Sequence, residues 1–216
     1  MSSIDRRSTR LAPLTAATGV LIFALSGFPA RAQEAAAVAQ NAADTAIGVC
    51  GTCHGPDGNS TDPIFPRLAG QHAGYLVRQL KSFKDQTRGD PYAIAYMWGM
   101  ASGLSDETID ALAQYYAGQK TGPGKSHDAA TTARGRDIFE HGVPSEGVPA
   151  CAACHGPDAL GSDMYPRLAG QHAEYILKQL ASFQSNMRNM AVMHGVAQNL
   201  RTPEMEAVAD YLESLP

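Results

Sequence analysis

Large apolar residues recur at helical spacing in two matching segments of the chain. Each segment carries three of them at positions i, i+4 and i+7: Leu76, Leu80 and Phe83 in the first, and Ile176, Leu180 and Phe183 in the second. This spacing places the three side chains on one face of an α-helix. The pattern therefore predicts two amphipathic helices, over residues 76–83 and 176–183.

Two later segments show a similar apolar face and begin at residues that suit a helix N-terminus. Ser105 is a favourable N-cap, and Thr202 is a second one, followed by proline at the first helical position. The residues expected on the buried faces are Ile109, Leu112, Ala113 and Tyr116 in the first segment, and Met205, Val208, Ala209 and Leu212 in the second. Shorter helices are expected near residues 41–50 and 130–141. No segment shows a strand-like alternation of useful length, so the predicted fold class is all-α.

An internal repeat divides the chain into two halves. Residues 66–73, with the sequence PRLAGQHA, recur letter for letter at residues 166–173, and the match continues with interruptions as far as Phe83 and Phe183. Such self-similarity indicates two copies of one folding unit. A segment rich in glycine, proline and serine separates the copies. We therefore expect domains at residues 33–120 and 130–216, joined by a linker at residues 121–129.

Residues 1–32 have the pattern of a secretory signal peptide. Arg6, Arg7 and Arg10 form a basic start, an apolar stretch follows, and residues 30–32 fit an A-x-A cleavage site. The alternative is an uncleaved membrane anchor, which glycine and proline within and beside the stretch disfavour. Export places the protein in the periplasm, where peripheral association with the membrane stays open.

Charge changes the picture once the leader is removed. The leader holds four of the 17 basic and one of the 21 acidic side chains, which leaves a net charge of −7 for the mature chain. An acidic protein of this kind is not expected to bind nucleic acid. Electrostatic steering would favour a partner protein with a positive patch.

All four cysteines lie in two copies of the pattern C-x-x-C-H. These are Cys50, Cys53 and His54 in the first half, and Cys151, Cys154 and His155 in the second. The pattern is the attachment signature of c-type haem, in which two thiols bind the porphyrin and the histidine binds the iron. A redox dithiol or a zinc site is the alternative, but the first needs a βαβ context and the second rarely places histidine directly after cysteine. The sequence predicts two covalently bound haem c groups, with His54 and His155 as axial ligands.

The repeat also selects a second iron ligand in each half. Met97 lies 18 residues before Tyr115, and Met193 lies 18 residues before Tyr211. In this register no other methionine has a methionine counterpart. Met97 and Met193 are therefore the expected sixth ligands. The alternatives are Met100 and Met190.

Other repeated residues are candidates for the surroundings of the haem. The carbonyls of Pro66 and Pro166 are expected to accept a hydrogen bond from the axial histidines. Arg67 and Arg167 are expected to neutralise a haem propionate, and Tyr75 and Tyr175 could do the same through their hydroxyls. Ordinary helix packing is the alternative for these arginines and tyrosines. His72 and His172 are expected to lie at a helix start or on the surface.

Taken together, these motifs resemble the dihaem cytochrome c4 family. The resemblance rests on C-x-x-C-H-G-P-D, then P-R-L-A-G-Q-H-A-x-Y-x-x-x-Q-L, then M-x-x-x-A-x-x-L, repeated in tandem over nearly the whole mature chain. It implies two tandem cytochrome c-like haem domains that face each other about a pseudo-twofold axis, with histidine and methionine on each iron. It also implies periplasmic electron transfer, often towards a terminal oxidase.

Three functions are compatible with this pattern. The preferred one is a respiratory electron carrier that is not an enzyme and that exchanges single electrons with redox partner proteins. The second is a dihaem enzyme such as a peroxidase, which requires an exchangeable position on one iron, and a matching methionine in both halves argues against it. The third is the electron-accepting subunit of a dehydrogenase.

Overall fold

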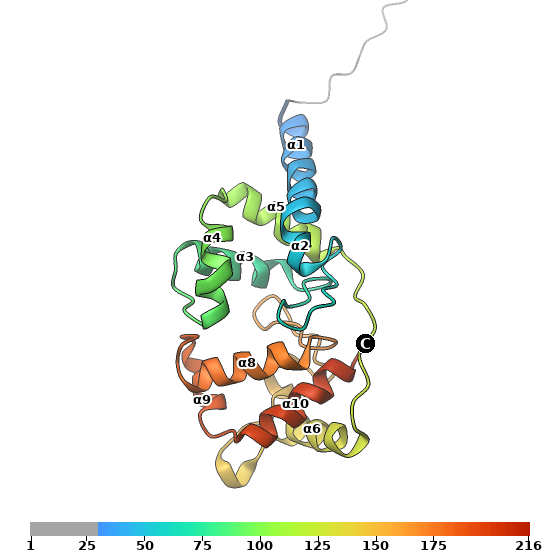
Figure 1. Ribbon diagram of the computed structural model, residues 1–216, viewed down its shortest axis with the longest axis vertical. Coiled ribbons are helices and arrows are strands. Elements are labelled where there is room, and N and C mark those ends of the chain that lie inside the picture. The colour runs from blue at the N-terminus through green and yellow to red at the C-terminus, as the bar shows by residue number, and fades with distance from the viewer. Residues whose placement is uncertain (1–29) are drawn as a thin grey trace, which may run out of the picture.

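The computed structural model describes residues 30–216, and this part of the chain is helical. Its only strand-like pairing is an isolated antiparallel bridge between Val143 and Val148. Two helical bodies are stacked along the long axis of the molecule, one from each half of the chain (Figure 1). The prediction of an all-α fold is confirmed. Most of the predicted signal peptide, residues 1–29, lies outside the described residues.

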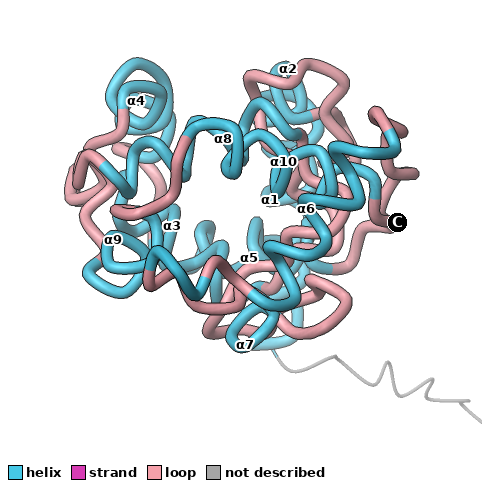
Figure 2. Tube along the Cα trace, turned by 90° about the horizontal axis from the view of Figure 1, so that it is seen from below, coloured by secondary structure: helices cyan, strands magenta, loops and turns pink. Residues whose placement is uncertain are grey.

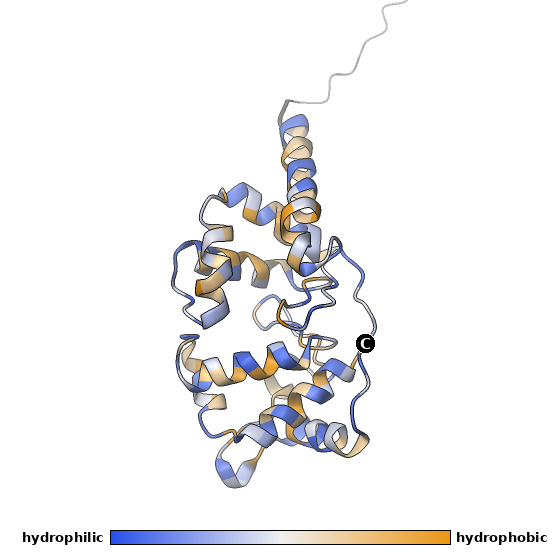
Figure 3. Cartoon of the chain, in the orientation of Figure 1, coloured by the Kyte–Doolittle hydropathy of each residue, from blue (hydrophilic) through white to orange (hydrophobic). Residues whose placement is uncertain are grey.

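Five α-helices and two π-helical segments form the first half. In chain order they are α1 (Ala30–Thr45), η1 (Ala46–Cys50), α2 (Gly51–His54), α3 (Ala73–Lys84), η2 (Ala93–Met97), α4 (Trp98–Ala101) and α5 (Asp106–Ala117). The short helix expected near residues 41–50 is the end of α1 together with η1. The outer part of α1 projects from the body of this half, and its sequence mixes polar and apolar residues (Figures 1 and 3).

The second half repeats this order with small differences. Its elements are α6 (Ala129–His141), η3 (Pro144–Glu146), α7 (Ala152–His155), α8 (Ala173–Gln184), α9 (Ala191–Ala197) and α10 (Thr202–Ser214). The first and last helices of each half pack together, α1 against α5 and α6 against α10. Figure 2 shows the same helical halves along the long axis. None of the helices described here is long and apolar enough to cross a membrane.

The predicted amphipathic helices are confirmed as α3 and α8. Leu76 and Phe83 are buried on α3, and their counterparts Ile176 and Phe183 are buried on α8. Each helix therefore turns its apolar stripe into the core of its own half, and buried apolar side chains of this size each stabilise the fold by about 1.5–3 kcal/mol.

The start of one late helix differs from the prediction. Ser105 caps α5 as expected, because its hydroxyl accepts a hydrogen bond from the Thr108 amide at 3.2 Å. The prediction that Thr202 caps α10 is wrong, since the cap position is Arg201 and Thr202 is already helical. The Glu204 carboxylate accepts from the Arg201 amide at 2.9 Å, which closes the first turn one residue earlier.

The two halves meet through the repeated segment before α3 and α8. The Gln71 side chain accepts from the Arg167 amide and donates to the Arg167 carbonyl, at 2.8 and 2.9 Å. The Gln171 side chain makes the same pair of hydrogen bonds with Arg67, also at 2.8 and 2.9 Å. These four reciprocal contacts have the symmetry of the sequence repeat. Gln71 and Gln171 occupy the same position of the repeat, and each binds the backbone of the opposite half.

A second reciprocal cluster lies between α3 and α8. Arg88 donates to the Gln179 side chain at 2.8 Å and to the Tyr175 hydroxyl at 3.2 Å. Arg188 likewise donates to the Gln79 side chain and to the Tyr75 hydroxyl, both at 2.8 Å. Both tyrosines therefore contact an arginine of the opposite half.

The segment that joins the halves packs closely against them. The Asn59 side chain bonds the Lys120 carbonyl at 3.0 Å and the Gly122 amide at 2.7 Å. The Lys125 amide donates to the Glu213 carbonyl of α10 at 2.9 Å. The linker is therefore anchored on the first half at one end and on the second half at the other.

Candidate haem sites

Each C-x-x-C-H motif lies on a single helical turn that ends at its histidine. The first motif spans the end of η1 and all of α2, and the second spans Cys151 and α7. One turn of helix brings the two cysteines of each motif to the same side. None of the four cysteines is in a disulfide. Glycine follows each motif with φ near +80°, a backbone conformation in which the chain turns away from the histidine and which favours glycine.

The axial histidine candidates are buried and their rings are oriented. His54 Nδ1 lies 2.9 Å from the Pro66 carbonyl, and His155 Nδ1 lies 3.0 Å from the Pro166 carbonyl. Because a carbonyl only accepts, Nδ1 carries the proton and Nε2 keeps a free lone pair. Burial lowers the pKa of both histidines below the ordinary value, although the carbonyl contact opposes it. The neutral imidazole thus favoured is the form that binds a metal.

Aromatic side chains pack beside both histidines at equivalent positions of the repeat. Phe65 meets His54 edge to face with ring centroids 6.1 Å apart, and Tyr165 meets His155 at the same separation. The two residues differ, so identity between the halves does not reveal this pair, although both directly precede the repeated proline.

The two predicted methionine ligands are less exposed than the alternatives. Met97 ends η2 and packs against the apolar cluster around Phe83, and Met193 lies on α9 against the core of the second half. Both are half-buried. The alternatives Met100 and Met190 are 47% and 42% exposed.

The residue after each of these methionines anchors its segment. Trp98 Nε1 donates to the Arg88 carbonyl at 2.8 Å, and His194 Nδ1 lies 2.9 Å from the Phe183 carbonyl. Trp98 and His194 occupy the same position of the repeat, so different side chains fix equivalent segments. Sequence comparison of the halves could not find this pair, since it depends on a shared donor and not on residue identity.

The structure places Arg67 and Arg167 at the junction of the halves. Arg67 Nη1 donates to the Pro123 and Gly170 carbonyls at 2.8 and 3.0 Å, and Arg167 Nη2 donates to the Pro216 carbonyl at 2.5 Å. Within residues 30–216 the Nε atom of each arginine is buried without a hydrogen-bond partner. An unpaired buried donor of this kind suits a carboxylate. Together with the two free thiols and the neutral histidine of each motif, these arginines fit a haem at each motif.

Among the described residues, no group of three or more histidine, cysteine, aspartate or glutamate side chains is arranged to hold a metal ion. The zinc alternative would require such a group.

Comparison with known proteins supports a haem site in each half of the chain. The Cytochrome c family model matches residues 32–119 and again residues 132–216. The chain is 39% identical to cytochrome c4 of Stutzerimonas stutzeri over 180 residues, which cover 78% of this chain and 85% of the relative. It is also 36% identical to a thiosulfate dehydrogenase electron acceptor of Thiomonas intermedia, over 77% of this chain and 78% of the relative.

A solved structure agrees with these relatives. Cytochrome c4 of Acidithiobacillus ferrooxidans superposes with a TM-score of 0.74 at 42% identity, over 77% of this chain and 98% of that one. The two tandem matches, the duplicated attachment motif and the shared fold identify two covalent haem c groups and a role in electron transfer. The chain belongs to the cytochrome c family and, within it, to the dihaem cytochromes c4.

Proposed function

We propose that this dihaem cytochrome is a periplasmic electron carrier in which both irons are closed by protein ligands. The ligands are His54 with Met97 in the first half and His155 with Met193 in the second. The observation that carries the proposal is the matched setting of the two methionines, half-buried and anchored by the next residue in both halves. A thioether on the sixth position raises the potential and excludes other ligands.

Each haem would supply reversible one-electron oxidation and reduction of its iron. The protein residues hold that centre in place: Cys50 and Cys53, and Cys151 and Cys154, attach the two rings through thioether bonds. The Pro66 and Pro166 carbonyls keep each histidine in one tautomer and one orientation. The unpaired Nε atoms of Arg67 and Arg167 would donate to haem propionates.

The wider assignments rest on the sequence pattern. Residues 1–32 would direct export, and the haem domains would span residues 33–120 and 130–216, with residues 121–129 as the linker. The electrons would pass between respiratory partners and on towards a terminal oxidase. The acidic mature chain supports a partner with a positive docking surface.

The electron-accepting subunit of a dehydrogenase is the second candidate. It is supported by the relative from Thiomonas intermedia, which is named as a thiosulfate dehydrogenase electron acceptor. The two candidates differ in their donor. Rapid reduction of the purified protein by a thiosulfate dehydrogenase would favour this role, whereas rapid oxidation of the reduced protein by respiratory membranes would favour the first.

Carbon monoxide binding to the reduced protein tests the ligand assignments. The unmodified protein should show no change in its haem absorption bands. Met97→Ala and Met193→Ala should each bind about one carbon monoxide per protein, because each opens one iron. The matched controls Met100→Ala and Met190→Ala should bind none. Carbon monoxide binding to the unmodified protein would favour an enzyme with an open site. Carbon monoxide binding to Met100→Ala but not to Met97→Ala, or to Met190→Ala but not to Met193→Ala, would show that the wrong methionine was assigned in that half.

A further inference from the structure

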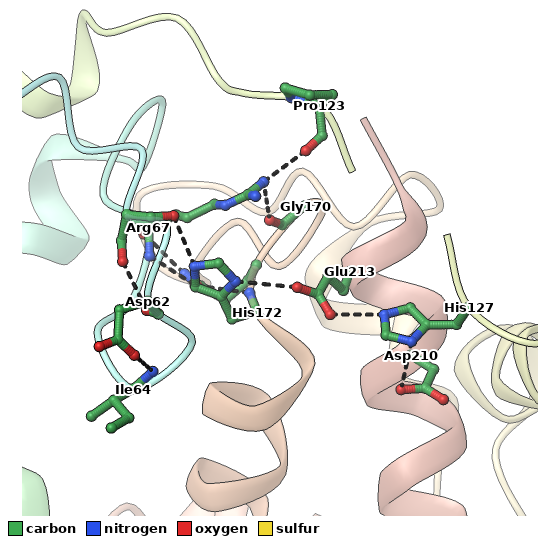
Figure 4. A network of polar contacts seen from close by, with 11 residues as sticks. Asp62, Ile64, Arg67, Pro123, His127, Gly170, His172, Asp210 and Glu213 are labelled. Atoms are coloured by element: carbon green, nitrogen blue, oxygen red, sulfur yellow. Dashed lines mark hydrogen bonds and ion pairs between the residues drawn. The ribbon is translucent and has the colours of Figure 1, made fainter. Parts of the chain in front are cut away.

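A chain of four titratable side chains runs from the junction of the halves into the second half (Figure 4). His172, at the start of α8, lies with Nδ1 3.1 Å from Glu213 Oε1. Glu213 Oε2 lies 2.7 Å from Nε2 of His127, which belongs to the linker. His127 Nδ1 lies 3.4 Å from Asp210 Oδ1. None of these four groups is among the residues assigned above to the haem sites.

His172 also reaches across the junction. Its Nε2 lies 3.0 Å from the Ser60 carbonyl of the first half. Its side chain is only 5% exposed, and so is that of Glu213. The His172 imidazole therefore joins the first half to α10, and the Glu213 carboxylate joins α10 to the linker.

The hydrogen-bond partners determine how many protons the His172 ring carries. The Ser60 carbonyl only accepts, so Nε2 must carry a proton. Burial raises the pKa of Glu213, but hydrogen bonds from His172 and His127 outweigh it and lower that pKa below the ordinary value. An ionised Glu213 only accepts as well, so Nδ1 of His172 must carry a second proton. Both ring nitrogens of His127 face carboxylates in the same way.

Two other charged groups near this chain, Asp62 and Arg67, make contacts elsewhere. The Asp62 carboxylate, on the same loop as Ser60, accepts from the Ile64 amide at 2.9 Å. The Arg67 guanidinium donates to the Pro123 and Gly170 carbonyls. Among the described residues, the carboxylates within 4 Å of the two imidazoles are those of Glu213 and Asp210, both on α10.

The repeat provides an internal comparison. His72 is the counterpart of His172, and its Nε2 lies 2.8 Å from the Leu160 carbonyl across the junction. In the register that pairs Tyr115 with Tyr211, however, Ala117 stands where the second half has Glu213. His72 therefore needs one proton for its contact, whereas His172 needs two. The ionic chain is not a general requirement of the repeated fold.

We propose that His172 is a buried imidazolium that clamps the two halves and the linker together in a proton-dependent way. The clamp is closed while the His172 ring holds two protons and Glu213 is ionised. As the pH rises and the Nδ1 proton leaves, a ring lone pair faces the Glu213 carboxylate and the clamp weakens. At strongly acidic pH Glu213 becomes protonated and the ion pair is lost from the other side. The clamp is thus closed only within a pH window.

Nitrogen-15 NMR of the histidine rings in the reduced dihaem protein tests the proton count directly. At pH 6 both ring nitrogens of His172 should carry protons, whereas the contact of His72 requires only one. A single proton on His172 at pH 6 would overturn the proposal. This measurement needs no variant and does not depend on the redox role of the protein.

Hydrogen exchange tests the clamp. The reporter is the Lys125 amide, which donates to the Glu213 carbonyl at 2.9 Å. His172→Gln keeps a donor for the Ser60 carbonyl but removes the charge. It should lower the protection of this amide about tenfold at pH 6 and less than twofold at pH 8.5. The control His72→Gln should change it less than twofold at both pH values. An equal loss at both pH values, or an equal loss in the control, would overturn the proposal.

Discussion

The reciprocal glutamine contacts between the halves allow a quantitative prediction for Gln171→Ala. The Gln171 side chain accepts from the Arg67 amide at 2.8 Å and donates to the Arg67 carbonyl at 2.9 Å. It also accepts from the His172 amide at 3.1 Å. The side chain is buried, with 8% of the residue exposed. The substitution therefore leaves the Arg67 amide, the Arg67 carbonyl and the His172 amide without a side-chain partner.

The expected cost follows from those groups. A buried backbone group without its partner costs about 1–3 kcal/mol. Arg67 is only partly buried, so water can reach its backbone and the lower end of that range applies to each group. We expect Gln171→Ala to lower the free energy of unfolding by about 2–3 kcal/mol. Because the lost contacts join the halves, the halves should also unfold less cooperatively, which lowers the slope of the transition.

Urea unfolding of the dihaem protein at pH 7, followed by far-ultraviolet circular dichroism, measures both effects. The matched control is Gln114→Ala, because Gln114 is exposed on α5. The control should change stability by less than about 0.5 kcal/mol. If Gln171→Ala behaved like the control, with an unchanged slope, the reciprocal contacts would not hold the halves together.

Three further predictions concern single side chains, and thermal or urea unfolding of the dihaem protein measures each. Ser105→Ala should cost about 1 kcal/mol through loss of the α5 cap, whereas Thr202→Ala should cost less than about 0.5 kcal/mol because that residue is not a cap; equal losses would contradict the assigned cap. Asp90 forms a buried ion pair with Arg88, in which Arg88 Nε lies 2.6 Å from Asp90 Oδ2. Burial raises the pKa of Asp90, but the charge of Arg88 lowers that pKa by more and leaves it below the ordinary value. The ion pair therefore stabilises the protein at neutral pH, and this stabilisation is lost as the pH falls. Asp90→Asn should cost about 3 kcal/mol at pH 7, and the cost should decrease progressively as the pH falls below about 4; a loss independent of pH would refute the ion pair. Gly135→Ala should prevent normal packing of α6 on α10, because the new methyl group would lie 1.9 Å from a carbonyl of α10; Gly99→Ala meets nothing within 4 Å and should leave stability unchanged or raised, so similar effects of the two would refute the packing.

Most helices could be predicted because their signals are local. The spacing of Leu76 and Phe83 reproduces the 3.6-residue period, and the Ser105 cap acts within one turn. The start of α10 was misplaced by one residue because Glu204 closes the first turn on Arg201, and threonine before proline gives no sign of that contact.

The candidate haem sites were predictable where chemistry requires a fixed spacing. Two cysteines and a histidine must share one helical turn, and the histidine ring needs an acceptor, which the Pro66 carbonyl provides. The methionine assignment needed the repeat as well, because each half contains more than one methionine. The assignment of Met97 and Met193 stays a prediction, and the greater exposure of Met100 and Met190 supports it.

The roles of the polar residues at the junction could not be read from one half alone. His172 was expected at a helix start or on the surface; it does begin α8, but it is buried, so a surface position is wrong. Tyr75 and Tyr175 meet Arg188 and Arg88, contacts that join residues about a hundred positions apart.

Most of the helices, the duplication and the two attachment motifs could be read from the sequence, because each depends on spacing within one turn or on identity between the copies. Tertiary structure alone decided how the copies face each other. That arrangement pairs Gln71 with Arg167 and places Glu213 behind His172 but leaves Ala117 in the matching position of the first half. The reason is physical: periodicity specifies which face of a helix is buried, whereas a contact between two domains depends on their relative orientation, which no local pattern records.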